Sequence, residues 1–285
     1  MAEYFSLQAA LFFATSHVLI RRGLATSNAV TGAFVSLGLT ALILWALLPF
    51  FTPLSDLRTP AVWVFLAAGL FAPGIGRTLT YVGIEKLGVA RSTPISNASP
   101  MFASVLAVFV LGEIWSPVNF LGTALVISGI AILSGARGGK GRWRRLDLVY
   151  PVVAAVVFGV STNLRKLGLT IASRPLMAAA VTATTAFVFV VCLLQARGGL
   201  PALKLSRSNY RWFFAAGFAN TAATLSVFHA LSFGEVVVVE PLVASNPVFS
   251  LIMSAVFLKD LETITPRVVA GALCTVAGTV LVVLR

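Results

Sequence analysis

The chain has 285 residues, of which 58% are hydrophobic and only 11% are charged, and its formal net charge is +12. Soluble domains carry about a quarter of charged residues, so this composition excludes a water-facing surface over most of the molecule. A soluble protein this basic would suggest nucleic acid, but here Lys and Arg fall between apolar runs, so we expect no nucleic-acid partner.

The apolar runs predict ten membrane crossings, because a helix needs about 20 apolar residues to span a bilayer. The predicted spans are Tyr4–Arg21, Asn28–Phe51, Pro60–Ile84, Val89–Leu111, Pro117–Ser134, Leu148–Leu167, Arg174–Gln195, Tyr210–Leu231, Val236–Leu258 and Thr265–Leu284. The sequence therefore predicts an all-α, multi-pass protein of the cell membrane, which is the cytoplasmic membrane in a prokaryote.

Two of the polar candidates lie in the first and sixth spans. His17 lies in the middle of the first span, and Asn163 lies in the sixth. A lone buried His is more often structural, and an intramembrane Asn often holds helices together. Both side chains can also bind a polar ligand, so both are candidate substrate-binding residues.

The third span contains a break signal and a charge. Pro73, Gly74 and Gly76 loosen the helix and admit a close backbone neighbour, so they are candidate gating positions. Arg77 follows about 10 Å from the end of the span, where a charge needs a cavity or a partner unless it snorkels to the headgroups. We predict that Arg77 binds substrate, together with Tyr81 one turn further on.

The fourth and ninth spans each carry two prolines six residues apart. These residues are Pro94, Pro100, Pro241 and Pro247. Each proline frees a backbone carbonyl, which is tolerated in a membrane only where protein or water satisfies it. The alternatives are a broken helix that lines a cavity and a plain kink; the recurrence of both prolines favours the first. Asn97 and Asn246 lie among them and are predicted to contact substrate.

Glu240 directly precedes Pro241 in the ninth span. A carboxylate that is neutral when buried and charged when wetted can couple proton movement to transport. The alternative is an interfacial Glu outside the hydrocarbon, paired with Arg165 or Lys166. We name Glu240 as the candidate for proton coupling.

The chain repeats itself once. Matching pairs, 145 to 147 positions apart, are Ser16 with Ser161, Gly23 with Gly168, Pro94 with Pro241, Pro100 with Pro247, and Glu113 with Asp260. We divide the chain into a first repeat (1–135), a basic loop (136–147) and a second repeat (148–285). Because each repeat crosses the membrane an odd number of times, the second repeat has the opposite orientation in the membrane, as in many secondary transporters.

The repeated stretch resembles the EamA-type family of the drug/metabolite transporter superfamily. The stretch 81–133 reads N-A-S-P-M-F, then V-L-G-E, then L-G-T-A-L-V-I-S-G, and its partner at 228–283 reads E-P-L, S-N-P-V-F and L-K-D. At Lys259-Asp260 the chain departs from the Gly-Glu pair that proteins of this family usually carry. The resemblance implies ten helices, a cavity between two bundles and transport of small metabolites.

We therefore predict a secondary transporter, an exporter or exchanger of an amino acid or a related polar or amphipathic solute. The sequence shows no phosphate loop, metal-ligand cluster or nucleophile triad, so we expect no enzyme, no cofactor and no metal. A flippase for a lipid-linked head group and a non-transporting accessory subunit remain alternatives. Small-residue rows in the fifth and tenth spans suit close helix packing or a homodimer contact.

The charges also predict an orientation. Most Lys and Arg residues fall in the loops after the odd-numbered spans, which the positive-inside rule puts in the cytoplasm, with both termini outside. The family resemblance favours the opposite, because such transporters are often drawn with cytoplasmic termini. We retain the orientation that the charges give.

Overall fold

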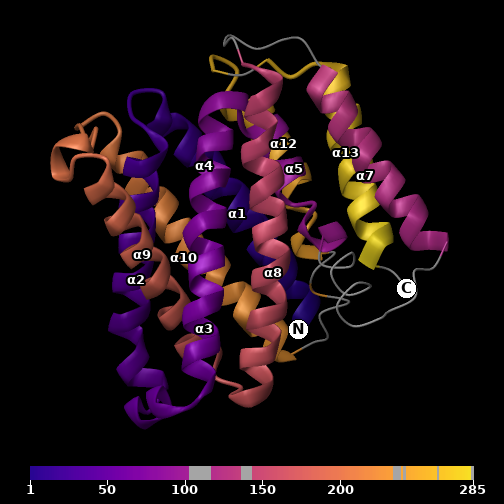
Figure 1. The fold of residues 1–285 in the computed structure, drawn as a ribbon. Coiled ribbons are helices and arrows are strands. Elements are labelled where there is room, and N and C mark those ends of the chain that lie inside the picture. The colour runs from indigo at the N-terminus through magenta and orange to yellow at the C-terminus, as the bar shows by residue number, and fades with distance from the viewer. Residues whose placement is uncertain (103–116, 136–142, 234–238, 240–241, 262, 284–285) are drawn as a thin grey trace.

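The computed structural model describes residues 1–102, 117–135, 143–233, 239, 242–261 and 263–283 (Figure 1). Within these residues the chain is helical and contains no strand. The principal helices are α1 (Ala2–Leu24), α2 (Ala29–Phe51), α3 (Ala61–Gly69), α4 (Gly76–Leu87), α5 (Val89–Ser96), α7 (Pro117–Gly135), α8 (Val149–Ile171), α9 (Pro175–Ala196), α10 (Tyr210–Phe233), α12 (Asn246–Phe257) and α13 (Pro266–Val283). A π-helical turn, η2 (Leu70–Ile75), joins α3 to α4, and short 3-10 turns lie at Leu54–Arg58, Arg145–Leu148 and Leu200–Ala202.

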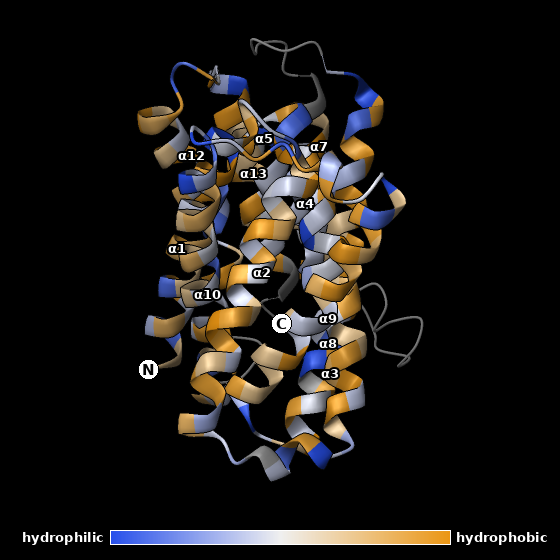
Figure 2. Cartoon of the chain, turned by 90° about the vertical axis from the view of Figure 1, so that its left-hand side faces the viewer, coloured by the Kyte–Doolittle hydropathy of each residue, from blue (hydrophilic) through white to orange (hydrophobic). Residues whose placement is uncertain are grey.

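Five stretches in the described part of the chain are long and apolar enough to cross a membrane. They are Ala29–Phe51, Ala61–Leu87, Arg145–Ile171, Pro175–Ala196 and Tyr210–Phe233. Large apolar side chains cover the outside: Leu42 is 68% exposed and Ile252 is 59% exposed. Hydrophobic residues predominate along the middle of the helices (Figure 2). The fold is that of a helical multi-pass membrane protein.

The sixth predicted span ends later than expected. We predicted an end at Leu167, but α8 continues to Ile171, about one turn further. Arg165, which the predicted span already included, lies within this helix. Arg91 lies inside α5 and is only 5% exposed.

Among the described helices, the largest interfaces join residues before the basic loop to residues after it. α1 packs on α10, α2 on α9, α3 and α4 on α8, α5 on α12, and α7 on α13. Two hydrogen bonds occupy equivalent positions of the two repeats in these interfaces. Ser16 Oγ donates to the Ala216 carbonyl at 3.2 Å, and Ser161 Oγ donates to the Ala68 carbonyl at 2.9 Å.

Two glycine contacts match in the same way. A Cβ on Gly23 of α1 would lie 2.4 Å from the ring of Phe213 on α10. A Cβ on Gly168 of α8 would lie 2.4 Å from the ring of Phe65 on α3. Both rings are fully buried. Each glycine therefore allows a close approach between helices that are far apart in the sequence.

Helices α7 and α13 lie side by side at one edge of the bundle (Figure 1). Their small residues face each other. A Cβ on Gly278 would lie 2.6 Å from the Gly122 carbonyl, and one on Gly129 would lie 2.3 Å from Thr275 Oγ1. The small-residue rows of these two helices therefore serve packing within one chain.

Candidate functional site

A polar cavity lies inside the bundle. The volume open to the centres of water-sized molecules is about 120 Å³, which is several times what one water needs. Its polar lining residues are His17, Thr40, Arg77, Thr80, Ser96, Asn97, Ser99, Thr162, Arg165, Thr182, Thr224 and Asn246, and its apolar ones are Phe13, Pro73, Phe158, Ala183, Val227, Phe228, Val243 and Ala244. Helices from both sides of the basic loop contribute to the wall.

The third predicted span, which comprises α3, η2 and α4, is interrupted beside this cavity. Within η2, Ala72 has φ −147° and ψ 124°, which are extended and not helical values. The interruption falls at the predicted Pro73 and Gly74, because proline cannot continue the hydrogen-bond ladder. Helix α8 satisfies the Ala72 carbonyl, which the break frees from the helical ladder: Ser161 Oγ donates to it at 3.0 Å and Arg165 Nη2 at 2.6 Å.

The fourth and ninth predicted spans are interrupted as well. Turns occupy residues 97–98 and 244–245, each beside a proline-containing segment. Asn97 follows α5 directly, and its amide donates to the Thr93 carbonyl at 2.9 Å. Asn246 opens α12, and its side-chain oxygen accepts from Ser250 Oγ at 2.9 Å. The two breaks place an amide from each segment on the cavity wall.

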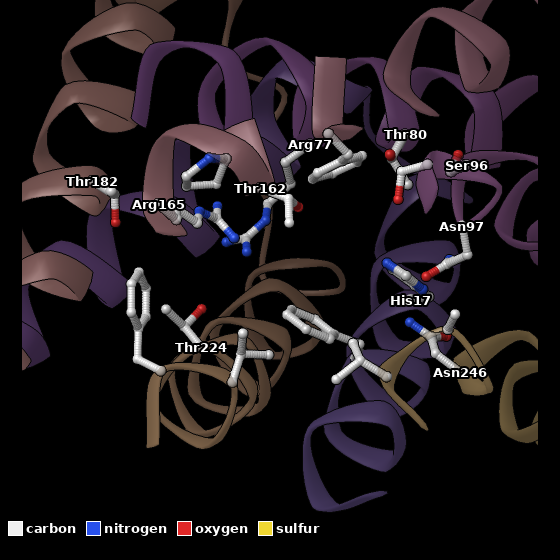
Figure 3. A pocket seen from close by; sticks show the side chains of 18 of the residues that line it. His17, Arg77, Thr80, Ser96, Asn97, Thr162, Arg165, Thr182, Thr224 and Asn246 are labelled. Atoms are coloured by element: carbon white, nitrogen blue, oxygen red, sulfur yellow. The ribbon is translucent and has the colours of Figure 1, made fainter. Parts of the chain in front are cut away.

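Two arginines reach the cavity from different helices. Arg77 of α4 is 8% exposed, and its Nη1 has no hydrogen-bond partner in the structure. Arg165 of α8 is half-buried, and its guanidinium lies 5.7 Å from the centre of the Phe228 ring. Figure 3 shows the two guanidinium groups close together, with Thr162 beside them. A cation at this depth is costly unless something polar faces it.

His17, Asn97 and Asn246 form a separate group. Figure 3 shows these three side chains on the side of the cavity away from Arg165. His17 is 9% exposed and its Nδ1 lacks a partner, as does Oγ of the nearly buried Ser96. Buried polar groups in proteins are normally hydrogen-bonded, so unpaired donors and acceptors around a cavity indicate contacts that a ligand or water completes.

The structure brings some of the predicted site residues together and not others. His17, Arg77, Asn97, Asn246 and Pro73 line the cavity. Gly74, Gly76, Pro94, Pro100 and Pro247 are buried in the interrupted segments without lining it. Glu240 and Pro241 lie outside the described residues.

Tyr81 and Asn163 lie away from the cavity wall. Tyr81 is fully buried, accepts a hydrogen bond from Asn220 Nδ2 at 2.7 Å, and lies 3.3 Å from Ser36 Oγ. It therefore links three helices. Asn163 is exposed on α8 and donates to the Gly159 carbonyl of its own helix at 3.0 Å. Its neighbour Thr162 faces the cavity instead.

Sequence reasoning missed Arg165, Thr162 and Ser96 as cavity residues. A signal for Arg165 was present: it lies four residues after Ser161, on the same helical face as the serine that the repeat pairs with Ser16. From the sequence we consider Arg165 only as an interfacial partner of Glu240 and not as a cavity residue.

Apolar helices that enclose a polar cavity define a multi-pass membrane protein with an internal binding site. The model of the EamA-like transporter family matches residues 1–135 and 147–284, so the chain belongs to this family. This confirms the resemblance.

Known proteins similar to this chain are named as transporters. The uncharacterized transporter YwfM of Bacillus subtilis (strain 168) is 34% identical over 95 residues, which are 28% of this chain and 32% of that protein. The chain thus matches about a third of that relative's length. An uncharacterized transporter in the cobO 3′ region of Sinorhizobium sp is 28% identical over 138 residues, which are 46% of this chain and 95% of that protein.

A solved crystal structure of a protein shares the fold. It has a TM-score of 0.66 and 17% sequence identity, and the match covers 98% of this chain and 95% of that one. At this identity the likeness concerns the fold and not the solute.

Proposed function

We propose that this protein is a secondary transporter that moves a small polar or amphipathic solute by alternating access through the cavity between its helices. The observation that carries the proposal is a cavity inside a membrane bundle whose buried Arg77, His17 and Ser96 have unpaired polar atoms. Unpaired polar groups on a cavity wall are groups that a solute or water can complete. The sequence contains no phosphate loop, so a gradient or exchange supplies the energy.

The proposal includes ten helices arranged as two inverted five-helix repeats. Three pairs of observations support it. Ser16 and Ser161 make equivalent bonds, Gly23 and Gly168 make equivalent close contacts, and helix breaks recur at 97–98 and 244–245. Related positions thus serve related roles, as two inverted copies around one cavity require.

Uptake into proteoliposomes tests the function. We expect the purified protein to move a soluble metabolite, and we expect Thr224→Trp to block uptake because the indole fills the cavity from α10. Phe218→Trp is the matched control, since Phe218 lies on the same helix and is 59% exposed. Absence of solute movement in vesicles would favour an accessory subunit, and competition by lipids in place of metabolites would favour a flippase.

A further inference from the structure

The end of the cavity that holds His17 is built from three helices. His17 belongs to α1, Ser96 and Asn97 lie at the end of α5, and Asn246 opens α12. These helices pack on one another, and all four side chains line the cavity. Because Asn97 and Asn246 lie at the two helix breaks, each break contributes an amide to the same end of the cavity.

The hydrogen bonds among the described residues leave one atom of each amide for a ligand. Asn97 Nδ2 donates to the Thr93 carbonyl at 2.9 Å, so its side-chain oxygen remains as an acceptor. Asn246 Oδ1 accepts from Ser250 Oγ at 2.9 Å, so its side-chain nitrogen remains as a donor. Figure 3 shows the oxygen of Asn97 and the nitrogen of Asn246 turned toward His17. This end of the cavity therefore presents both an acceptor and a donor.

Two further polar atoms at this end have no hydrogen-bond partner. They are Nδ1 of His17, which is 9% exposed, and Oγ of Ser96, which is 3% exposed. A hydroxyl donates and accepts, and an imidazole nitrogen does one or the other according to its tautomer. Together with the Asn97 oxygen and the Asn246 nitrogen, the described wall offers four hydrogen-bonding atoms to a ligand group.

The number and kind of these atoms discriminate between ligand groups. A primary carboxamide has two N–H donors and an oxygen with two lone pairs, so it can bond to all four atoms. Its N–H group matches the Asn97 oxygen, and its carbonyl matches the Asn246 nitrogen. A carboxylate or a ketone only accepts, an ammonium group only donates, and a hydroxyl makes fewer bonds. Each of these leaves a buried polar atom unpaired, which costs free energy.

We propose that this end of the cavity is a subsite for a primary carboxamide, and that the solute is a small molecule that carries one. The inference rests on the proposed function, since it names the substrate class of the same cavity. Phe13, Phe158 and Phe228 also line the cavity. They offer apolar contacts to a chain or ring attached to the amide.

Thermal unfolding of the purified protein tests the subsite without any transport. The probes are butyramide and benzamide, each beside two molecules of the same shape. One is the methyl ketone, which lacks the N–H donors, and the other is the carboxylate, which lacks them and is charged. Because a ligand of the native state raises its apparent stability, we expect each amide to raise the melting temperature more than its ketone and its carboxylate.

Substitutions locate the effect. Ser96→Ala removes a hydroxyl that has no partner, so the protein without ligand should keep its melting temperature. Its response to the amides should shift to concentrations about two- to tenfold higher, because one hydrogen bond to the ligand is lost. Asn246→Leu should remove the response, and Ser96→Ala still tests the subsite if the Asn246 variant does not fold.

Ser254→Ala is the matched control. Oγ of Ser254 is also buried and unpaired, and Ser254 belongs to α12, but it does not line the cavity. The response to the amides should therefore equal that of the parent. A loss of response in both serine variants would show that the effect does not come from the cavity, and would overturn the subsite.

The subsite and the transport function fail separately. Ketones or carboxylates that stabilise as well as the amides, no stabilisation by either amide, or an unchanged response in Ser96→Ala would overturn the subsite. If vesicles took up only solutes without an amide, transport would stand and the assignment of the solute would be wrong. Conversely, amides that bind through Ser96 without any uptake into vesicles would refute transport and leave the subsite in place.

Discussion

The contact between Gly168 and Phe65 sets the spacing of α8 and α3, and Gly168→Ala tests it. The added Cβ would lie 2.4 to 2.8 Å from three atoms of the Phe65 ring, well inside the usual separation of carbon atoms. The ring cannot swing away easily because Phe65 is fully buried. Overpacking of this kind costs about 1–3 kcal/mol of unfolding free energy.

A double-mutant cycle in detergent gives the measurement. We expect Phe65→Leu to restore much of the stability lost in Gly168→Ala, with a coupling free energy of about 1 kcal/mol or more. Gly23→Ala with Phe213→Leu is the matched pair and should behave alike, because its closest approach is also 2.4 Å. Additive effects in both cycles would show that the helices are further apart than described, and would refute the reasoning.

The remaining predictions concern the cavity and the orientation. Arg77→Lys should weaken solute binding several-fold at near-normal protein yield, since a bidentate fork becomes a point charge; equal affinity in an equilibrium binding assay would make Arg77 structural. Glu240→Gln should retain solute exchange and lose proton-driven accumulation, and surviving accumulation with unchanged pH dependence would exclude Glu240 from coupling. Ser161→Ala should lower stability by about 0.6–2 kcal/mol in thermal unfolding, because the broken third helix loses a donor. A C-terminal reporter that is active only in the cytoplasm should stay silent, and a signal would reverse the orientation that the charges predict.

Much of the helical fold follows from the sequence, because lipid leaves the chain few choices. Every backbone polar group must be satisfied within a span, so long apolar runs become helices. The break in the third helix was also predictable, since Pro73 and Gly74 act on the backbone locally. Such local effects need no knowledge of neighbouring helices.

Which side chains face the cavity was harder to predict, because that depends on how helices are rotated against each other. Thr162 and Asn163 are adjacent and differ by about 100° around α8, yet the first lines the cavity and the second is exposed. Polarity alone favours Asn163 as the residue that contacts the solute. Tyr81 has the chemistry of a ligand-binding residue, but Asn220 on α10 already donates to its hydroxyl.

The pairing of early with late helices has a consequence for synthesis of the chain. The main packing partner of α1 is α10, and the ring of Phe213, 190 residues later, packs against Gly23. The ribosome therefore delivers the first helices into the bilayer long before their neighbours exist. Until the later helices are inserted, lipid occupies the surfaces that those helices will cover. The order in which the helices enter the membrane therefore differs from the order in which they pack.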